Sequence, residues 1–145
     1  MAASSAIPGA KAALKTRLAA RANLKTVQIS YGPPIPNPGR EFIWLADAPD
    51  SQHDVFLGQM KREEEFTLQA IVSVLREGVD QQSATERAYA LVDEIHADLN
   101  TDPTINGALA NGWARITATP LTELANDTAR EARVVVEITC HARIT

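Results

Sequence analysis

The feature that most constrains this chain is the alternation of apolar and polar side chains over residues 130–145. No Gly or Pro interrupts it, so the two parities lie on opposite faces of one strand. The apolar parity consists of Ala132, Val134, Val136, Ile138, Cys140, Ala142 and Ile144. At about 3.3 Å per residue the strand spans roughly 45 Å. A domain of this length has a radius of gyration of about 15 Å. The sequence therefore predicts a sheet built around a strand that crosses the whole domain.

A second long strand and a long helix are predicted to pack with it. Residues 63–75 alternate, with Phe66, Leu68, Ala70, Val72 and Val74 on one face. The helix begins with a capping-box match in which Ser83 is the N-cap and Glu86 the N3 residue. Its apolar stripe consists of Ala84, Ala88, Leu91, Val92, Ile95 and Leu99. The run 100–103, which ends in Pro, stops the helix, and we expect its stripe to share one core with the last strand.

Shorter elements fill the rest of the chain. We predict a helix over 6–24 and strands over 26–31 and 40–48, joined by a stiff connector with four prolines. A short strand or ordered arm follows over 55–60, and His53 is placed in a polar loop. A strand over 113–119 either ends there or continues past Pro120 to Leu124, and forms a hairpin with the last strand. The fold class is α+β: a mostly antiparallel sheet with an N-terminal helix and one long amphipathic helix packed on it, in a single domain, 1–145.

Composition excludes several classes of protein. The 145 residues are 45% hydrophobic and 22% charged, as in an ordinary globular domain. No apolar run approaches the roughly 18 residues of a membrane span, and residues 1–5 do not resemble a secretory signal. A net charge of −4 with 5% aromatic residues argues against a dedicated nucleic-acid binder. The single cysteine excludes an internal disulfide and indicates an intracellular folding compartment.

No catalytic constellation is found. The sequence lacks HExxH, a Gly-rich phosphate loop, CxxC and GxSxG. Cys140 and His141 are neighbours on a strand and point to opposite faces, and Cys140 lies in the buried parity. Asp93 and His96 are expected to form a surface pair, and the three histidines share no spacing. We therefore expect no catalytic residue, no cofactor and no metal site.

Charged residues supply the candidate interaction sites. Arg17, Arg21 and Lys25 form a like-charged row on the first helix, and no acid precedes Glu41 to relieve it. The row is either a solvated face or a surface that meets a neighbouring subunit or another anionic surface. The acidic run 63–65 cannot converge on a cation, because adjacent strand residues alternate faces, so it is a solvated or interface patch. The candidate interface residues are Arg17, Arg21, Lys25, Arg40, Glu63 and Glu64.

The order of these parts resembles the tail-terminator (tail-completion) proteins of long-tailed bacteriophages. The resemblance rests on the helix 11–24 and on Val27-Gln28-Ile29-Ser30-Tyr31-Gly32 before the Pro-rich loop. It continues through the strand 64–72, the helix 86–99 with Asp102-Pro103-Thr104-Ile105-Asn106-Gly107 after it, and the strand 134–143. It covers most of the chain and is a similarity of architecture, without a diagnostic motif. Residues 48–62 and the 110–130 hairpin depart from the family's pattern.

The resemblance implies a non-catalytic structural protein. It implies a hexameric ring, made of copies of this chain, that caps the finished tail-tube protein and presents a surface to the head–tail connector protein. DNA would be met only in passage through the channel, and no membrane would be involved. The protein would be assembled in the host cytoplasm and would lie in the virion at the head–tail junction. The alternatives are another neck or tail component (a head–tail stopper or adaptor, or a tube subunit), a nucleic-acid-binding module, and a small enzyme.

Overall fold

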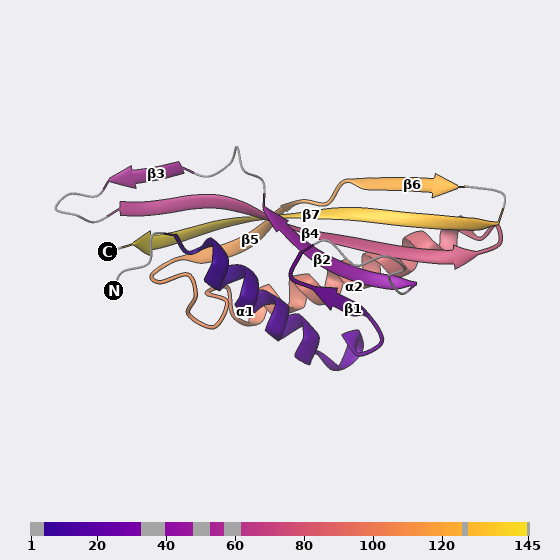
Figure 1. Cartoon of the computed structure of the whole chain (residues 1–145), viewed down its shortest axis with the longest axis horizontal. Coiled ribbons are helices and arrows are strands. Elements are labelled where there is room, and N and C mark those ends of the chain that lie inside the picture. Colours follow the sequence, from indigo (N-terminus) through magenta and orange to yellow (C-terminus); the bar gives the residue numbers. More distant parts are fainter. Residues whose placement is uncertain (1–4, 33–39, 48–52, 57–61, 126–127, 145) are drawn as a thin grey trace.

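The computed structural model describes residues 5–32, 40–47, 53–56, 62–125 and 128–144. They form a seven-stranded sheet with the path β1-β2-β4-β7-β5, on which β3 also pairs with β4 and β6 with β7 (Figure 1). The elements are α1 (Ile7–Ala20), the 3-10 turn η1 (Ala22–Leu24), β1 (Gln28–Ser30), β2 (Glu41–Asp47), β3 (His53–Phe56), β4 (Arg62–Glu77), α2 (Gln81–Thr101), β5 (Trp113–Ala118), β6 (Leu121–Ala125) and β7 (Ala129–Ile144). The predicted α+β class, with two helices on a mostly antiparallel sheet, is confirmed.

Strands β4 and β7 form the centre of the sheet. They are antiparallel over their whole length, from the pair Arg62↔Ile144 to the pair Glu77↔Ala129. Figure 1 shows both strands running from one end of the molecule to the other. The two long strands expected from alternation are therefore confirmed, and each is extended by one or two residues beyond the alternating run.

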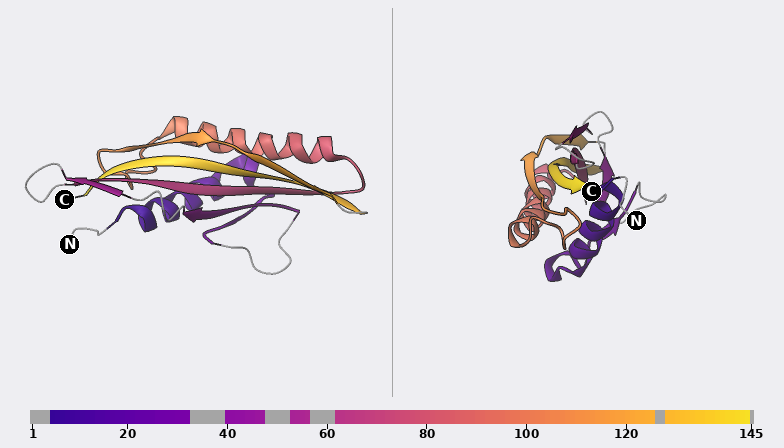
Figure 2. Two further views of the ribbon diagram at one scale, coloured as in Figure 1. Left: turned by 90° about the horizontal axis from the view of Figure 1, so that it is seen from above. Right: turned by 90° about the vertical axis from the view of Figure 1, so that its left-hand side faces the viewer.

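One face of this pair carries the core. The apolar parity of β7 from Ala132 to Ala142 is buried, and Ile144 packs against it. The stripe of α2, from Ala84 to Leu99, lies in the same cluster, which confirms the expected shared core. Ala10, Leu14 and Leu18 of α1 complete it, and the end-on view of Figure 2 shows both helices on the same side of the sheet.

The opposite face carries no described helix. Its middle is an apolar row across three strands, Trp44, Ile71 and Val135, held side by side by the register of β2, β4 and β7. Around this row the outward parity of β7 is half-buried and polar, as at Glu137 and Thr139. The sheet is thus covered on one face by the described helices and faces outward on the other (Figure 2).

The start of α2 differs from the prediction. The N-cap is Asp80, not Ser83, and its Oδ1 accepts a hydrogen bond from the Ser83 N–H at 2.9 Å. Ser83 is thus the third residue of the helix, and Glu86 bonds Gln82 at 2.8 Å instead of closing a capping box. Asp80 lies three residues before Ser83, and Asp is as good an N-cap residue as Ser. In the structure the helix begins at this earlier residue. The expected end of the helix, at 100–103, is confirmed.

The shorter elements required smaller corrections. The first helix ends at Ala20 because Arg21 is extended (ψ 132°), and only the single turn η1 follows. His53 belongs to β3 and not to a loop, and the predicted strand or arm at 55–60 coincides with the structure only at its first two residues. Residues 57–61 and the Pro-rich segment 33–39 lie outside the described residues.

The last hairpin is confirmed, with a break at Pro120. Strands β5 and β6 both pair antiparallel with β7, and β5 itself contains a register shift between Ile116 and Ala118. Proline has no N–H for the ladder, so the strand is divided in two there, although the Pro120 carbonyl still accepts the N–H of Val135 at 3.1 Å. Strand β1 pairs parallel with β2, which makes the sheet mixed at that edge.

Candidate functional site

The edge strand β5 is positioned by the turn that follows α2. Asp102 Oδ1 accepts hydrogen bonds from the Thr104 N–H (3.0 Å) and the Thr104 hydroxyl (2.6 Å), and its Oδ2 accepts one from the Asn106 N–H (3.0 Å). These bonds hold the pKa of Asp102 below its ordinary value. The chain then turns through positive φ at Ile105 (51°), Asn106 (55°) and Gly107 (78°). Side-chain capping by one aspartate therefore both ends the helix and aims the chain at the sheet.

Gly112 lets the chain enter β5 close to β7. A Cβ atom at this position would lie 1.7 Å from the carbonyl oxygen of His141 and 2.6 Å from its carbon. These are backbone atoms of the central strand and cannot move aside. The Arg143 N–H also donates a hydrogen bond to the Ala110 carbonyl (2.8 Å), which holds the chain just before Gly112 close to β7. Only glycine fits at this point of contact between the two strands.

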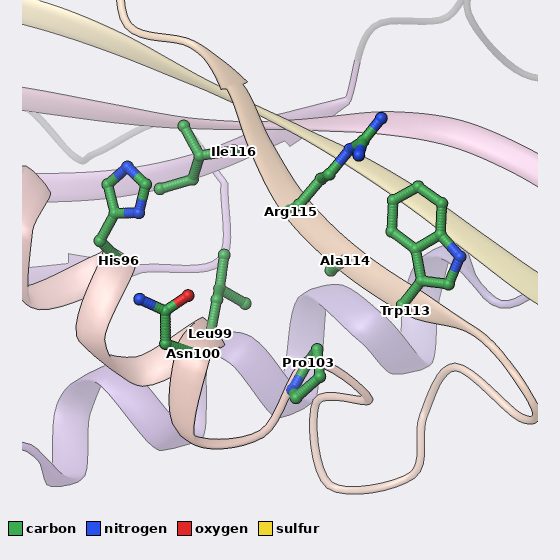
Figure 3. Close-up of a pocket in the computed structure, with 8 residues that line it drawn as sticks. All are labelled: His96, Leu99, Asn100, Pro103, Trp113, Ala114, Arg115 and Ile116. Carbon is green, nitrogen blue, oxygen red and sulfur yellow. The ribbon is translucent and has the colours of Figure 1, made fainter.

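A cleft of about 380 Å³ follows the outer edge of β5. It is lined by His96, Leu99, Asn100, Pro103, Trp113, Ala114, Arg115 and Ile116 (Figure 3). The α2 side chains His96 and Asn100 are exposed, and Leu99 forms part of the buried floor. Figure 3 shows Trp113 and Arg115 projecting on the side of β5 that faces away from α2. The cleft thus lies between a helix and the edge of the sheet.

Trp113 joins this edge to a charged cluster on the outer face. Its ring lies 4.2 Å from the imidazole of His141, centroid to centroid, and the Arg115 guanidinium lies 4.9 Å from the Trp113 ring centroid. His141 Nδ1 is 3.0 Å from Glu63 Oε1, and Nε2 is 3.6 Å from Glu65 Oε2. Three adjacent strands, β4, β7 and β5, supply these side chains. Trp and Arg are the residues most enriched at energetically important protein contacts.

The cluster has the groups for binding but lacks a nucleophile. Cys140, the neighbour of His141, points into the core on the other face, where burial raises the pKa of its thiol to about 12. Among the described residues, no group of three His, Cys, Asp or Glu side chains is arranged to hold a metal ion. No helix in the described part of the chain is long and apolar enough to cross a bilayer.

The structure places Arg17 and Arg21 against acids of α2. Arg17 Nε lies 3.0 Å from Asp98 Oδ2, and its Nη1 lies 2.9 Å from Asp102 Oδ2. Arg21 Nη2 lies 2.8 Å from Glu94 Oε2. Hydrogen bonds from Asn23 and from Arg21 lower the pKa of Glu94. The basic row of α1 thus meets an acidic row of the same chain, a partner that the sequence analysis did not consider.

The other candidate interface residues are distributed over the molecule. Lys25 is exposed at the end of η1, and no described residue forms an ion pair with it. Arg40 pairs with Glu77 on the surface. Glu64 is fully buried, and its carboxylate accepts hydrogen bonds of 2.7 Å from the Ser5 hydroxyl and the Ala6 N–H. Glu63 belongs to the His141 cluster. The structure therefore brings none of the six together except Arg17 and Arg21, and their role between subunits stays a prediction.

Nothing in the sequence alone marks Trp113, Arg115 and the edge of β5 as a site. Trp113 was assigned to a strand and given no role, because the pairing of His141 with Trp113 and Glu65 appears only once the strand register is known. The acidic row was recognisable: Glu94, Asp98 and Asp102 recur every four residues on the second helix, as Arg17 and Arg21 do on the first.

Comparisons with known proteins support the fold. No family model matches the chain, and no curated protein matches it in sequence. Among solved structures, one similar chain belongs to a structure described as the virion of a native gene transfer agent particle. The superposition has a TM-score of 0.58 at 11% sequence identity and covers 97% of this chain and 100% of the other. The two chains therefore share a fold over nearly their whole length.

Proposed function

We propose that this chain is a structural subunit of a tailed, phage-like particle, and specifically a tail terminator. The observation that carries the proposal is the end-to-end likeness to a chain of a gene transfer agent virion, with neither chain leaving a large part unmatched. The order of elements that resembles tail-terminator proteins supports the finer assignment. The role needs a stable scaffold and contact surfaces, and it needs no catalytic group.

In this role, copies of the chain form a ring that caps the completed tail tube and joins it to the head connector. Such a ring requires two different faces on each subunit, because its contacts are heterologous. The molecule has two distinct sheet edges, with β5 and β6 on one side and β1 and β3 on the other. The presence of two different edges on one sheet supports a subunit that assembles into a ring.

The proposal is tested by mass measurement and by tube growth. Native mass spectrometry of the purified protein, alone and with tail tubes, is expected to find a closed ring, with hexamer the expected number. Added to polymerising tube subunits, the protein should stop growth and appear at one tube end by negative-stain microscopy. A protein that stays monomeric in both conditions and leaves tube length unchanged would refute the proposal.

The second candidate is another component of the same region: a stopper, an adaptor or a tube subunit. The description of the matching structure gives the particle and not the position of the chain within it, which keeps this candidate open. The tube-growth experiment separates the candidates. A tube subunit would polymerise by itself, and a stopper or adaptor would bind the head connector without changing tube length.

A subunit that lets DNA slide past should not hold it, because each phosphate neutralised by Lys or Arg adds salt-dependent affinity. The ion pairs of Arg17 and Arg21 with Glu94, Asp98 and Asp102 neutralise the most basic part of α1 within the chain. We expect no gel shift of duplex DNA at micromolar protein near physiological salt. A shift with a steep salt dependence would favour the nucleic-acid-binding alternative.

A further inference from the structure

We infer that the free edge of β5 accepts strand β3 of a second copy of this chain, so that the sheet continues from one subunit into the next. The inference rests on the proposed ring and names the contact that would hold it together. It is carried by the hydrogen-bonding groups that each edge presents, by the directions of the two strands and by the cleft beside β5. Addition of a strand to an exposed edge is a common mode of protein recognition.

The outward groups of β5 follow from two hydrogen bonds. In an antiparallel pair, backbone groups point alternately toward the partner strand and away from it. The Ala114 N–H bonds the Pro103 carbonyl (2.8 Å), which lies on the side away from β7. Ala114 and Ile116 therefore direct their N–H and C=O groups outward, and Trp113 and Arg115 bond β7. No described residue bonds the Ala114 carbonyl or either backbone group of Ile116.

The outward groups of β3 follow in the same way. The Leu75 N–H bonds the Arg40 carbonyl (2.7 Å), so the odd-numbered residues of β4 point toward the edge that carries β2 and β3. His53 and Val55, which are paired with Glu65 and Glu63, therefore bond β4. Asp54 and Phe56 direct their backbone groups outward, and no described strand other than β4 pairs with β3.

The two edges lie at the same end of the sheet and match in direction. At the end of the sheet where both termini lie, the strands follow one another in the order β3, β4, β7, β5 (Figure 1). Each of these neighbours is antiparallel, so β3 and β5 also run in opposite directions. A copy placed beside the first in the same orientation brings its β3 antiparallel to β5, which is the more stable pairing.

A single register satisfies both edges. Pairing Ile116 with Asp54 of the next copy exchanges two backbone hydrogen bonds. The new ladder ends beside Arg115, because the Pro103 carbonyl already bonds the Ala114 N–H and occupies the next position along the edge. Arg115 and Val55 become a non-hydrogen-bonded pair, whose Cα atoms lie about 4.5 Å apart in such ladders.

The cleft provides the space for the incoming strand. It runs along β5 between Pro103 and Ile116, and the exposed side chains of His96 and Asn100 line its helical wall. Because β3 and β5 are different surfaces, each copy donates one edge and accepts the other, and repetition of this contact closes a ring when the rotation permits.

Disulfide trapping tests the contact and its register. The native Cys140 is buried, so engineered cysteines are the reactive ones. Arg115→Cys and Val55→Cys single variants should give a cross-linked dimer when mixed and mildly oxidised, and none alone. The double variant should give a ladder on a non-reducing gel that ends at the ring number. Cα atoms about 4.5 Å apart lie within the range that a disulfide bridges.

A matched control and a second variant make the test decisive. Gln28 is the exposed residue of β1, at the same sheet edge as β3, and Gln28→Cys should not link to Arg115→Cys. Asp54→Pro removes an outward N–H without affecting the pairing of β3 with β4, and should abolish both the cross-link and the ring. Each variant is first shown to be folded by circular dichroism.

The outcomes separate this contact from the proposed function. If rings are seen by mass spectrometry but no cross-link forms, the edge pairing is wrong and the ring stands. If cross-linked rings form but do not stop tube growth, the contact stands and the tail-terminator role is wrong. If no assembly forms, alone or with tubes, both are overturned.

Discussion

The two faces of the β4–β7 pair differ, although their residues alternate along the same two strands. Val136 is fully buried beneath the helices, whereas its neighbour Val135 is half-buried on the opposite face. The inner face is apolar from Ala132 to Ala142. The outer face mixes apolar residues with groups such as Glu137, Thr139 and His141. The comparison teaches that one face determines the fold, and that the other leaves side chains free for contacts outside the chain.

The largest expected effect tests this comparison directly. Val136→Asp places an unpaired carboxylate in the core, which costs several kcal/mol and is enough to unfold most domains. Val135→Asp makes the same chemical change one residue earlier on the outer face, and should cost clearly less. Circular dichroism and thermal melting of both variants measure the difference. Equal stability of the two would show that the faces are not distinct.

The second effect concerns the ion pairs beneath the sheet. Arg17→Met removes the closer of two arginines from Asp98, whose side chain is 7% exposed, and leaves it only Arg21 at 3.6 Å. The loss should cost about 2 kcal/mol. Arg133, which pairs with Glu131 on the outer face and is 42% exposed, is the matched control. Arg133→Met should cost less than about 1 kcal/mol. Denaturant unfolding gives both values. A similar loss in both variants would remove the distinction between the faces.

These contacts also revise the interface hypothesis for the basic row. If the row met only acids of a neighbouring subunit, reversing Arg17 and Arg21 to Glu would leave the monomer folded. With Glu94, Asp98 and Asp102 beside them, the reversal places like charges together between two helices. We expect the monomer itself to lose stability, which a melt of the dilute protein detects. A test of assembly therefore needs residues without internal partners.

A smaller effect is expected at the junction between β5 and β7. Gly112→Ala places a methyl group against the His141 carbonyl and should cost about 2 kcal/mol by forcing the two backbones apart. Gly9→Ala is the control, because a Cβ at that position meets nothing within 4 Å. Thermal melts of the two variants measure the cost. A neutral Gly112→Ala would contradict the close approach of the strands.

The smallest effect is a loss of stability in acid. Burial raises the pKa of Glu41, but hydrogen bonds from Arg87 and Arg76 outweigh it and hold the pKa below the ordinary value of 4.5. The folded protein therefore favours the ionised carboxylate. The stabilisation is fully present above that ordinary value and is lost as the pH falls through the lowered pKa of the folded state. Melts from about pH 7 to pH 3 should show less of this loss in Arg87→Gln than in the parent.

The sequence was sufficient where the signal is periodic. The alternation of β4 and β7 and the stripe of α2 predicted the three longest elements and their common core, because burial on one face imposes a period. The sequence was insufficient where the residues that interact lie far apart in the chain or where two local signals compete. The cap at Asp80 competes with an equally good local signal at Ser83. The acids of α2 that meet Arg17 are more than eighty positions away, and the edge at β5 exists only once strand order is fixed.

The pairing of β4 with β7 has a kinetic consequence. Every one of its residue pairs joins segments separated by α2, β5 and β6, so the centre of the sheet cannot begin as a local hairpin. Such non-local pairing slows folding, because the entropy of closing a long loop is lost before any contact compensates for it. Until β7 arrives, β4 exposes an apolar face and the edge opposite β2 and β3, which is a state prone to aggregation. During synthesis the centre of the sheet therefore stays incomplete until β7 has been made.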